Sequence, residues 1–184
     1  MTALPLVFVT SRAEKAAEAA RIGFDVERLV VDLPEPQALD PSEIVAEKAR
    51  SAYALLERPV LVEDSGLAVE AWGGFPGALV KWLERSAGVA ALAKMLDGFP
   101  DRSATAVCAI AYCDGGEVVS VRGEVSGSIA PSPRGSGGFG WDAIFVPEGG
   151  SRTFAEMAPA EKDRVSHRRR AWDALAARLP VGRR

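Results

Sequence analysis

A chain of 184 residues, 48% apolar and 26% charged, has the length and composition of one ordinary globular domain, which we expect to span residues 1–184. No run approaches the roughly 18 apolar residues of a membrane span, and the start lacks the basic stretch of a signal peptide, so we expect a cytoplasmic protein with no membrane partner. The formal net charge of −3 and the lack of basic–aromatic repeats argue against nucleic acid as a partner.

A strand–turn–helix unit opens the chain. Leu6–Val9 is an apolar run that predicts a buried strand, and the following residues predict a helix over 12–22, with Ser11 and Glu14 as a capping box. Such a unit directs helix N–H groups and Lys15 toward an anion, although capping and a surface lysine explain the same residues. The glycines of a P-loop are missing.

A second strand–helix unit follows. Residues 24–31 alternate loosely and predict a strand, after which Glu35 lies between two prolines that restrict its backbone. Asp40 begins a D-P-S-E segment that predicts a strong helix start, with proline at the first helical position. Lys48 lies beside the apolar stripe of this helix, where a lysine ordinarily extends to solvent.

An acidic segment follows the third apolar run. Residues 60–62 predict a short buried strand that ends in a turn, E-D-S-G, with Glu63 and Asp64 as its carboxylates, and residues 67–69 predict the return strand of a hairpin. Carboxylates at the end of a strand suit Mg²⁺, which takes one or two of them plus substrate phosphates. A plain polar turn is the alternative interpretation.

The second half predicts helices followed by an antiparallel hairpin. An aromatic, glycine-rich loop leads to a helix with Lys81, and a further helix covers residues 88–96. Strands at 103–113 and 117–125 flank an Asp-Gly-Gly turn and predict the centre of a second lobe. Cys108 and Cys113, an odd number of residues apart on one strand, should lie on opposite faces as free thiols.

The C-terminal part predicts two short strands and a helix. Ile129 is expected to begin one strand, and residues 143–146 to form the next. Ser166 is a plausible cap for a helix that reaches about residue 179. Three arginines, 168–170, occupy the positive end of that helix, where cations are disfavoured by about 0.3–1 kcal/mol each, which suggests an anionic or carbonyl-rich ligand beside them. His167 is the only histidine and fits such a site.

Eight short motifs together resemble the Ham1/inosine triphosphate pyrophosphatase family, in the family's order and across nearly the whole chain. F-G-W-D and S-H-R, with a lysine upstream, are the most specific. The motifs are T-S-R-A-E-K from Thr10, D-L-P-E ending at Glu35, E-I-V-A-E-K ending at Lys48, L-V-E-D-S-G around Asp64, G-G-F-P-G-A-L-V-K ending at Lys81, F-G-W-D at 139–142, T-F-A-E-M followed by Glu161-Lys162, and S-H-R at 166–168.

This resemblance implies an α/β fold in which helices flank a mixed central sheet in two lobes, with the active-site cleft between the lobes, and a homodimer. It implies Mg²⁺-dependent hydrolysis of inosine, deoxyinosine and xanthosine triphosphates to the monophosphate and pyrophosphate. Glu35 and Asp64 would hold the metal, and Asp64 would activate water, with Lys15 beside it in the catalytic set. The substrate would be bound by Thr10, Ser11, Arg12, Lys15, Lys48, Ser65 and Lys81 at the phosphates, and by Phe139, Gly140, Trp141, Asp142, Lys162, His167 and Arg168 at the base and sugar.

One position departs from the family pattern T-G-N-x-x-K, because this chain has Ser11 and Arg12 in place of glycine and asparagine. Arg12 would then either clamp a phosphate or point to solvent. Two other functions stay open: a nucleotide-binding module without turnover, and a pyrophosphatase for other modified nucleotides. The Maf-like proteins, which exemplify the latter, lack the F-G-W-D and S-H-R pair.

Overall fold

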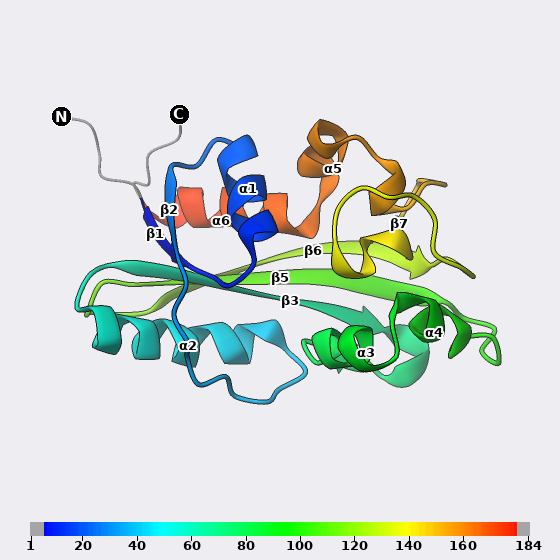
Figure 1. The fold of residues 1–184 in the computed structure, drawn as a ribbon, viewed down its shortest axis with the longest axis horizontal. Coiled ribbons are helices and arrows are strands. Elements are labelled where there is room, and N and C mark those ends of the chain that lie inside the picture. Colours follow the sequence, from blue (N-terminus) through cyan, green and yellow to red (C-terminus); the bar gives the residue numbers. More distant parts are fainter. Residues whose placement is uncertain (1–5, 180–184) are drawn as a thin grey trace.

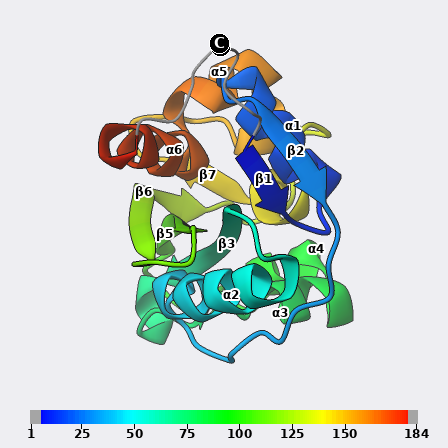
Figure 2. The ribbon, with the colours of Figure 1, turned by 90° about the vertical axis from the view of Figure 1, so that its left-hand side faces the viewer.

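The computed structural model describes residues 6–179, which form one seven-stranded mixed sheet with helices on both faces (Figures 1 and 2). The strand order is β2-β1-β3-β5-β6-β7. The short β4 also pairs with β3, farther along that strand than β1 does. No helix within this range is both long and apolar enough to cross a bilayer. The strands are β1 (Leu6–Val9), β2 (Val26–Leu29), β3 (Val60–Val69), β4 (Pro76–Gly77), β5 (Ser103–Cys113), β6 (Val119–Ile129) and β7 (Phe145–Pro147).

The helices cover the two faces of the sheet, and the shared interior is apolar. The helices are α1 (Ala13–Arg21), α2 (Pro41–Leu56), α3 (Val80–Ser86), α4 (Val89–Lys94), α5 (Pro159–Val165) and α6 (His167–Arg178), with single-turn 3₁₀ helices η1 (Glu70–Trp72), η2 (Gly140–Ala143) and η3 (Phe154–Glu156). In Figure 1, α1, α5 and α6 lie on one side of the long strands, and α2, α3 and α4 lie on the other.

The alternation of side chains along each strand explains this layering, because neighbouring residues face opposite sides. Val60 and Val62 of β3 pack with Val45 of α2, whereas Leu61 packs with Trp172 of α6. Cys108 and Cys113 follow the same rule on β5: both are buried and free, and they lie in different clusters on opposite faces. The prediction of two unpaired thiols is therefore confirmed.

The predicted E-D-S-G turn and its hairpin are wrong, because residues 60–69 form one continuous strand. β3 pairs antiparallel with β5 over its whole length, from Val60 opposite Cys113 to Val69 opposite Ala104. This ladder satisfies the backbone groups that a turn would have used. Gly66 does not serve a turn. Glycine is required at this position in the strand because an added Cβ would lie 2.8 Å from the carbonyl carbon of Gly77.

The hairpin of β5 and β6 is also longer and more central than predicted. It runs the length of the sheet as the neighbour of β3, so it belongs to both ends of the molecule and not to a second lobe (Figure 1). Ile129 ends β6 and does not begin a strand, and it pairs with Phe145 of β7. The backbone before β7 forms the helical turn η2 instead of an extension of that strand.

Helix starts were predicted with mixed success. Asp40 caps α2 by accepting a hydrogen bond from the Ser42 N–H at 2.8 Å, and Ser166 caps α6 by accepting one from the Arg169 N–H at 3.1 Å. The capping box at Ser11 is wrong, because the cap position of α1 is Arg12 and it makes no side-chain cap bond. The hydroxyl of Thr10 instead accepts from the Arg12 N–H at 3.2 Å.

Candidate active site

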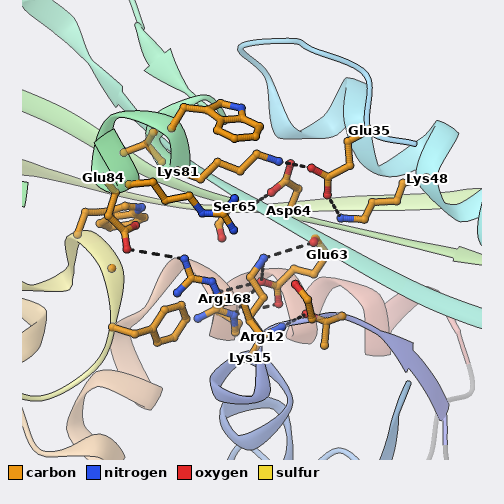
Figure 3. A pocket seen from close by; sticks show the side chains of 18 of the residues that line it. Arg12, Lys15, Glu35, Lys48, Glu63, Asp64, Ser65, Lys81, Glu84 and Arg168 are labelled. Atoms are coloured by element: carbon orange, nitrogen blue, oxygen red, sulfur yellow. Dashed lines mark hydrogen bonds and ion pairs between the residues drawn. The ribbon is translucent and has the colours of Figure 1, made fainter. Parts of the chain in front are cut away.

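A pocket of about 450 Å³ opens where the edge of β3 has no neighbour. β1 pairs with β3 only up to Val62, and β4 pairs with it only from Leu67, so residues 63–66 lie between the two partners. The walls come from the end of β1, the start of α1, the segment before α2, α3, η2 and the start of α6. Segments far apart in the sequence therefore meet at one short stretch of strand (Figure 3).

Asp64 faces the side of α2, where it joins Glu35 and two lysines. Its Oδ1 accepts a hydrogen bond from the Ser65 N–H at 2.9 Å, whereas its buried Oδ2 has no partner. Burial raises the pKa of Asp64, against the opposing charges of Lys15, Lys48 and Lys81. An unsatisfied buried oxygen is costly, so this atom is suited to a ligand that brings a cation or a donor.

Glu35 is held beside Asp64 by lysines from two helices. Lys48 of α2 donates to its Oε1 at 2.5 Å, and Lys81 of α3 donates to its Oε2. Burial alone would raise the pKa of Glu35, but the hydrogen bonds and charges of the two lysines outweigh it and lower that pKa to about 2. The carboxylate is therefore ionised at any physiological pH.

The donor set at Asp64 and Glu35 fits a magnesium ion. Mg²⁺ typically uses one or two carboxylates and completes its shell with water and substrate phosphate. Within residues 6–179 no group of three or more acidic, histidine or cysteine side chains could hold a metal unaided. The unpaired Oδ2 of Asp64 and the ionised Glu35 match the smaller number that a phosphate-assisted site needs.

Glu63 faces the opposite side of β3 and is neutralised there. Arg168 of α6 donates to its two carboxylate oxygens through Nε and Nη2 at 2.9–3.0 Å, and Lys15 Nζ lies 3.3 Å from Oε1 (Figure 3). Burial would raise the pKa of Glu63, but the charges of Arg168 and Lys15 outweigh it and lower that pKa. The Arg168–Glu63 pair is shielded from solvent, since neither side chain is more than 2% exposed.

Glu18 extends this buried network and was missed in the sequence. It lies on α1 one turn after Lys15, and it accepts hydrogen bonds from Arg168 and, at 2.8 Å, from Lys162. Lys162 also donates to Asp142 at 2.5 Å, and Asp142 in turn accepts from the Phe139 N–H at 2.8 Å. The i, i+3 spacing from Lys15 was the signal available, but nothing local marked Glu18 as buried.

Aromatic rings form the wall next to this network. The Phe139 ring lies over three cations, with Lys162 Nζ at 5.1 Å and Arg168 Cζ at 5.3 Å from its centroid. The Trp141 and His167 rings pack against each other at an interplanar angle of 32°, with centroids 5.2 Å apart. Burial and the positive charges of Arg168 and Lys162 lower the pKa of His167 well below its usual value, so the ring is neutral at pH 7. The wall therefore offers flat apolar faces beside fixed polar groups.

Arg12 lines the pocket, so it does not point away into solvent, and it makes no ion pair with the buried carboxylates Glu18 and Glu63. Its Nη2 lies 3.7 Å from Glu84 Oε1 on α3, and its Cζ lies 5.8 Å from the Phe139 centroid, the third of the three cations (Figure 3). Ser11 is exposed, and its carbonyl oxygen accepts from Arg28 at 2.9 Å.

The structure brings nearly all of the predicted site residues to one pocket. Lys162 is the exception, since it lies behind the wall and reaches the pocket through Asp142. Of the three arginines at the start of α6, only Arg168 lines the pocket, and its guanidinium is already held by carboxylates. Arg169 pairs with Asp173 at 2.8 Å and Arg170 donates to the carbonyl oxygen of Glu124, so protein groups account for these two arginines, and a ligand at this end of α6 stays a prediction that concerns Arg168.

Comparison with known proteins agrees with this architecture. The sequence model described as the Ham1 family matches residues 6–178. A dITP/XTP pyrophosphatase of Methanopyrus kandleri is 42% identical over 178 residues, covering 94% of this chain and 95% of its own length. Inosine triphosphate pyrophosphatase 1 of Trypanosoma cruzi is 47% identical over 154 residues, or 83% and 79% of the two chains. A solved HAM1 protein from Coxiella burnetii superimposes with a TM-score of 0.84 at 29% identity, over 97% and 99% of the chains.

Proposed function

The chain belongs to the Ham1 family, and from that premise we propose that it is a hydrolase that converts inosine, deoxyinosine and xanthosine triphosphates to the monophosphate and pyrophosphate, with Mg²⁺ as cofactor. The relatives named above carry the activity in their names. The observation that carries the proposal for this chain is the unpaired, buried Oδ2 of Asp64 in a pocket that holds an ionised Glu35 and several lysines.

Glu35 and Asp64 are the proposed ligands of the metal. Bound there, Mg²⁺ would neutralise charge on the phosphates and favour an ionised, polarised water. Lys48 and Lys81 fix the Glu35 carboxylate in place, so its orientation does not depend on the substrate. Their ammonium groups line the same pocket and would neutralise charge on a bound polyphosphate, and positioning plus charge neutralisation account for most catalysis of phosphoryl transfer.

Asp64 is the proposed group that orients and deprotonates the water that attacks the α-phosphorus. The Ser65 N–H uses one acceptor site of Oδ1 and Oδ2 has no partner, so the carboxylate keeps acceptor sites for both a metal and the attacking water. Lys15 lies close enough to contribute charge to both faces of β3, since it pairs with Glu63 and acts on Asp64 electrostatically. The phosphate end of the substrate would contact Thr10, Ser11, Arg12, Lys15, Lys48, Ser65 and Lys81.

The aromatic wall is the proposed site of the base. Phe139 would stack on the purine, and Trp141, Asp142, His167 and Arg168 would line its edge and the sugar, with Gly140 in the turn and Lys162 holding Asp142. A guanidinium carries five N–H donors, so Arg168 can hold its carboxylates and still donate to a ligand. Donors welcome the 6-oxo group of hypoxanthine and are left unpaired by the 6-amino group of adenine, which costs about 1–3 kcal/mol each.

The homodimer and the cytoplasmic location belong to the proposal as well. Phe75, Trp82 and Phe99 are each more than 40% exposed, and Trp72 lies between Phe75 and Phe99. Apolar surface of this kind favours a protein partner, and a second copy of the chain is the partner that the family resemblance suggests. Light scattering of the purified protein would give the mass directly.

Product analysis tests the reaction. The wild type is given inosine, xanthosine, guanosine and adenosine triphosphates with Mg²⁺ or with EDTA, and Asp64→Asn and the surface control Asp101→Asn are assayed in parallel. Monophosphate plus pyrophosphate from the first two substrates, lost in EDTA and in Asp64→Asn but kept in the control, supports the proposal. Release of orthophosphate would contradict it. Binding without turnover would favour the nucleotide-binding module, and turnover of other modified nucleotides alone would favour the remaining alternative.

A further inference from the structure

Arg12 and Glu84 form an ion pair that spans the pocket from one wall to the other. Arg12 belongs to the segment between β1 and α1, and Glu84 belongs to α3 on the far side (Figure 3). The Glu84 carboxylate also lies against the turn that carries Phe139, because a Cβ added at Gly140 would come within 3.1 Å of its Oε2. Any ligand that fills the pocket between these walls must pass beneath or displace this pair.

The pair is weak compared with every other cation–carboxylate contact of the pocket. Its atoms are 3.7 Å apart and make no hydrogen bond, and the side chains are 35% and 23% exposed. Arg168, by contrast, holds Glu63 through bonds of 2.9–3.0 Å at 2% exposure. Partly exposed ion pairs of this length contribute little to stability, so a ligand can recruit the Arg12 guanidinium at low cost.

The charge of the pocket supplies a reason for recruitment. Six arginine or lysine side chains and six aspartate or glutamate side chains line it, so the wall as a whole is close to neutral. A triphosphate is a polyanion, and it repels the Glu84 carboxylate while it attracts Arg12. A phosphate offers the guanidinium two oxygens in the geometry that it matches best, which is stronger than a single long contact.

We propose that Glu84 holds Arg12, which is assigned above to the phosphate end, in reserve until the polyphosphate of the nucleotide displaces this carboxylate. This inference rests on the proposed function for the identity of the ligand. Arg12 is a substrate-binding residue in this account, and Glu84 is its competitor.

Nucleotide affinity tests the exchange without relying on turnover. Calorimetry in EDTA gives the Kd of inosine triphosphate and of inosine monophosphate for the wild type, Arg12→Gln, Glu84→Gln and the double variant. Loss of a charge-assisted phosphate contact should weaken the triphosphate about 10-fold or more and leave the monophosphate within about 2-fold. Glu84→Gln should tighten the triphosphate by about two- to fivefold, and this gain should be smaller in the double variant, where only the lost repulsion by the Glu84 carboxylate remains.

Arg50→Gln and Glu47→Gln are the matched controls, since these residues form a comparable pair at 3.5 Å on the exposed face of α2, outside the pocket. Their affinities should equal that of the wild type. An unchanged triphosphate affinity in Arg12→Gln, or equal losses for the two nucleotides, would overturn the inference in favour of a fixed contact with Phe139. The proposed function fails by a separate result, the absence of pyrophosphate release by the wild type, which would leave a triphosphate-selective Arg12 established.

Discussion

Removing the Arg168 guanidinium should destabilise the protein strongly and in a pH-dependent way. Arg168→Met keeps most of the side-chain volume but leaves the buried Glu63 with Lys15, and the buried Glu18 with Lys162 and the partly exposed Arg21 at 3.9 Å. Breaking a buried ion pair by deleting one partner costs about 3–5 kcal/mol. With about 2–4 °C of Tm lost per kcal/mol in a domain of this size, Tm should fall by about 6–20 °C.

The pH dependence follows from the charges on the two glutamates. In the wild type, Arg168 helps to lower the pKa of both Glu63 and Glu18 although burial would raise them. Without the arginine, burial dominates, and the two pKa values should rise above the unfolded value of about 4.3. The folded variant then takes up protons that the unfolded chain does not, so its deficit relative to the wild type shrinks as pH falls from 7 toward 5.

Urea unfolding at pH 7 and pH 5 measures this deficit. Arg169→Met is the matched control, because the next arginine along α6 makes only a partly exposed i, i+4 pair with Asp173, worth about 0.3–0.5 kcal/mol. A deficit below about 1 kcal/mol for Arg168→Met, or one that grows as pH falls, would refute the account of Arg168 as the neutraliser of two buried carboxylates.

Three further predictions use other parts of the structure. Gly66→Ala should lower the free energy of unfolding by about 1–3 kcal/mol and reduce turnover, because the new Cβ would lie 2.8 Å from Gly77 and push the edge of β3 outward. Urea unfolding measures the first effect and kcat the second. Unchanged values would contradict the close packing. Neither Cys108 nor Cys113 should react with a disulfide reagent in the folded protein at pH 8, since both are buried and burial raises the pKa of the Cys108 thiol well above its usual value; rapid labelling without urea would disprove this. The low pKa of Glu35, about 2, implies stability that is complete above the unfolded pKa and lost between about pH 4.5 and 2, worth about 1 kcal/mol after discounting for solvent screening. In metal-free unfolding from pH 6 to 3, the free energy of unfolding should fall more steeply in the wild type than in Glu35→Gln, where Glu18 and Glu63 still contribute to the slope.

Local signals predicted the elements that local chemistry determines. The apolar run at Leu6–Val9, the cap of Asp40 and the cap of Ser166 each depend on residues within a few positions, and each is present in the structure. The turn at residues 114–116 likewise joins the two strands that were expected on either side. Such features are readable because their hydrogen bonds close within one turn of chain.

The acidic segment of β3 could not be read locally, because what stabilises it lies far away in the sequence. Its preference for a turn is overridden by pairing with β5, and Glu63 is neutralised by Lys15, 48 residues earlier, and by Arg168, 105 residues later. The burial of Glu18 could not be predicted for the same reason, since its partners Arg168 and Lys162 lie 150 and 144 residues away in the sequence. Family motifs predicted most of the residues that line the pocket. They did not reveal which carboxylates are already paired with cations of the protein.

The adjacent acids of β3 show why that distinction matters for chemistry. Glu63 and Asp64 are both buried, but successive side chains of a strand point to opposite faces of the sheet, so the two acids contact different partners. Glu63 meets a guanidinium and a lysine that use its oxygens, which makes it a fixed support for Arg168. Asp64 keeps one oxygen without a partner, and burial raises its pKa, whereas the pKa of Glu63 is lowered. The unpartnered oxygen is therefore available to a cation or a water. Exchanging the two residues would preserve composition and charge, yet it would place the longer side chain on the α2 face and leave Arg168 with a carboxylate one methylene too short, so the order Glu-Asp is itself part of the site.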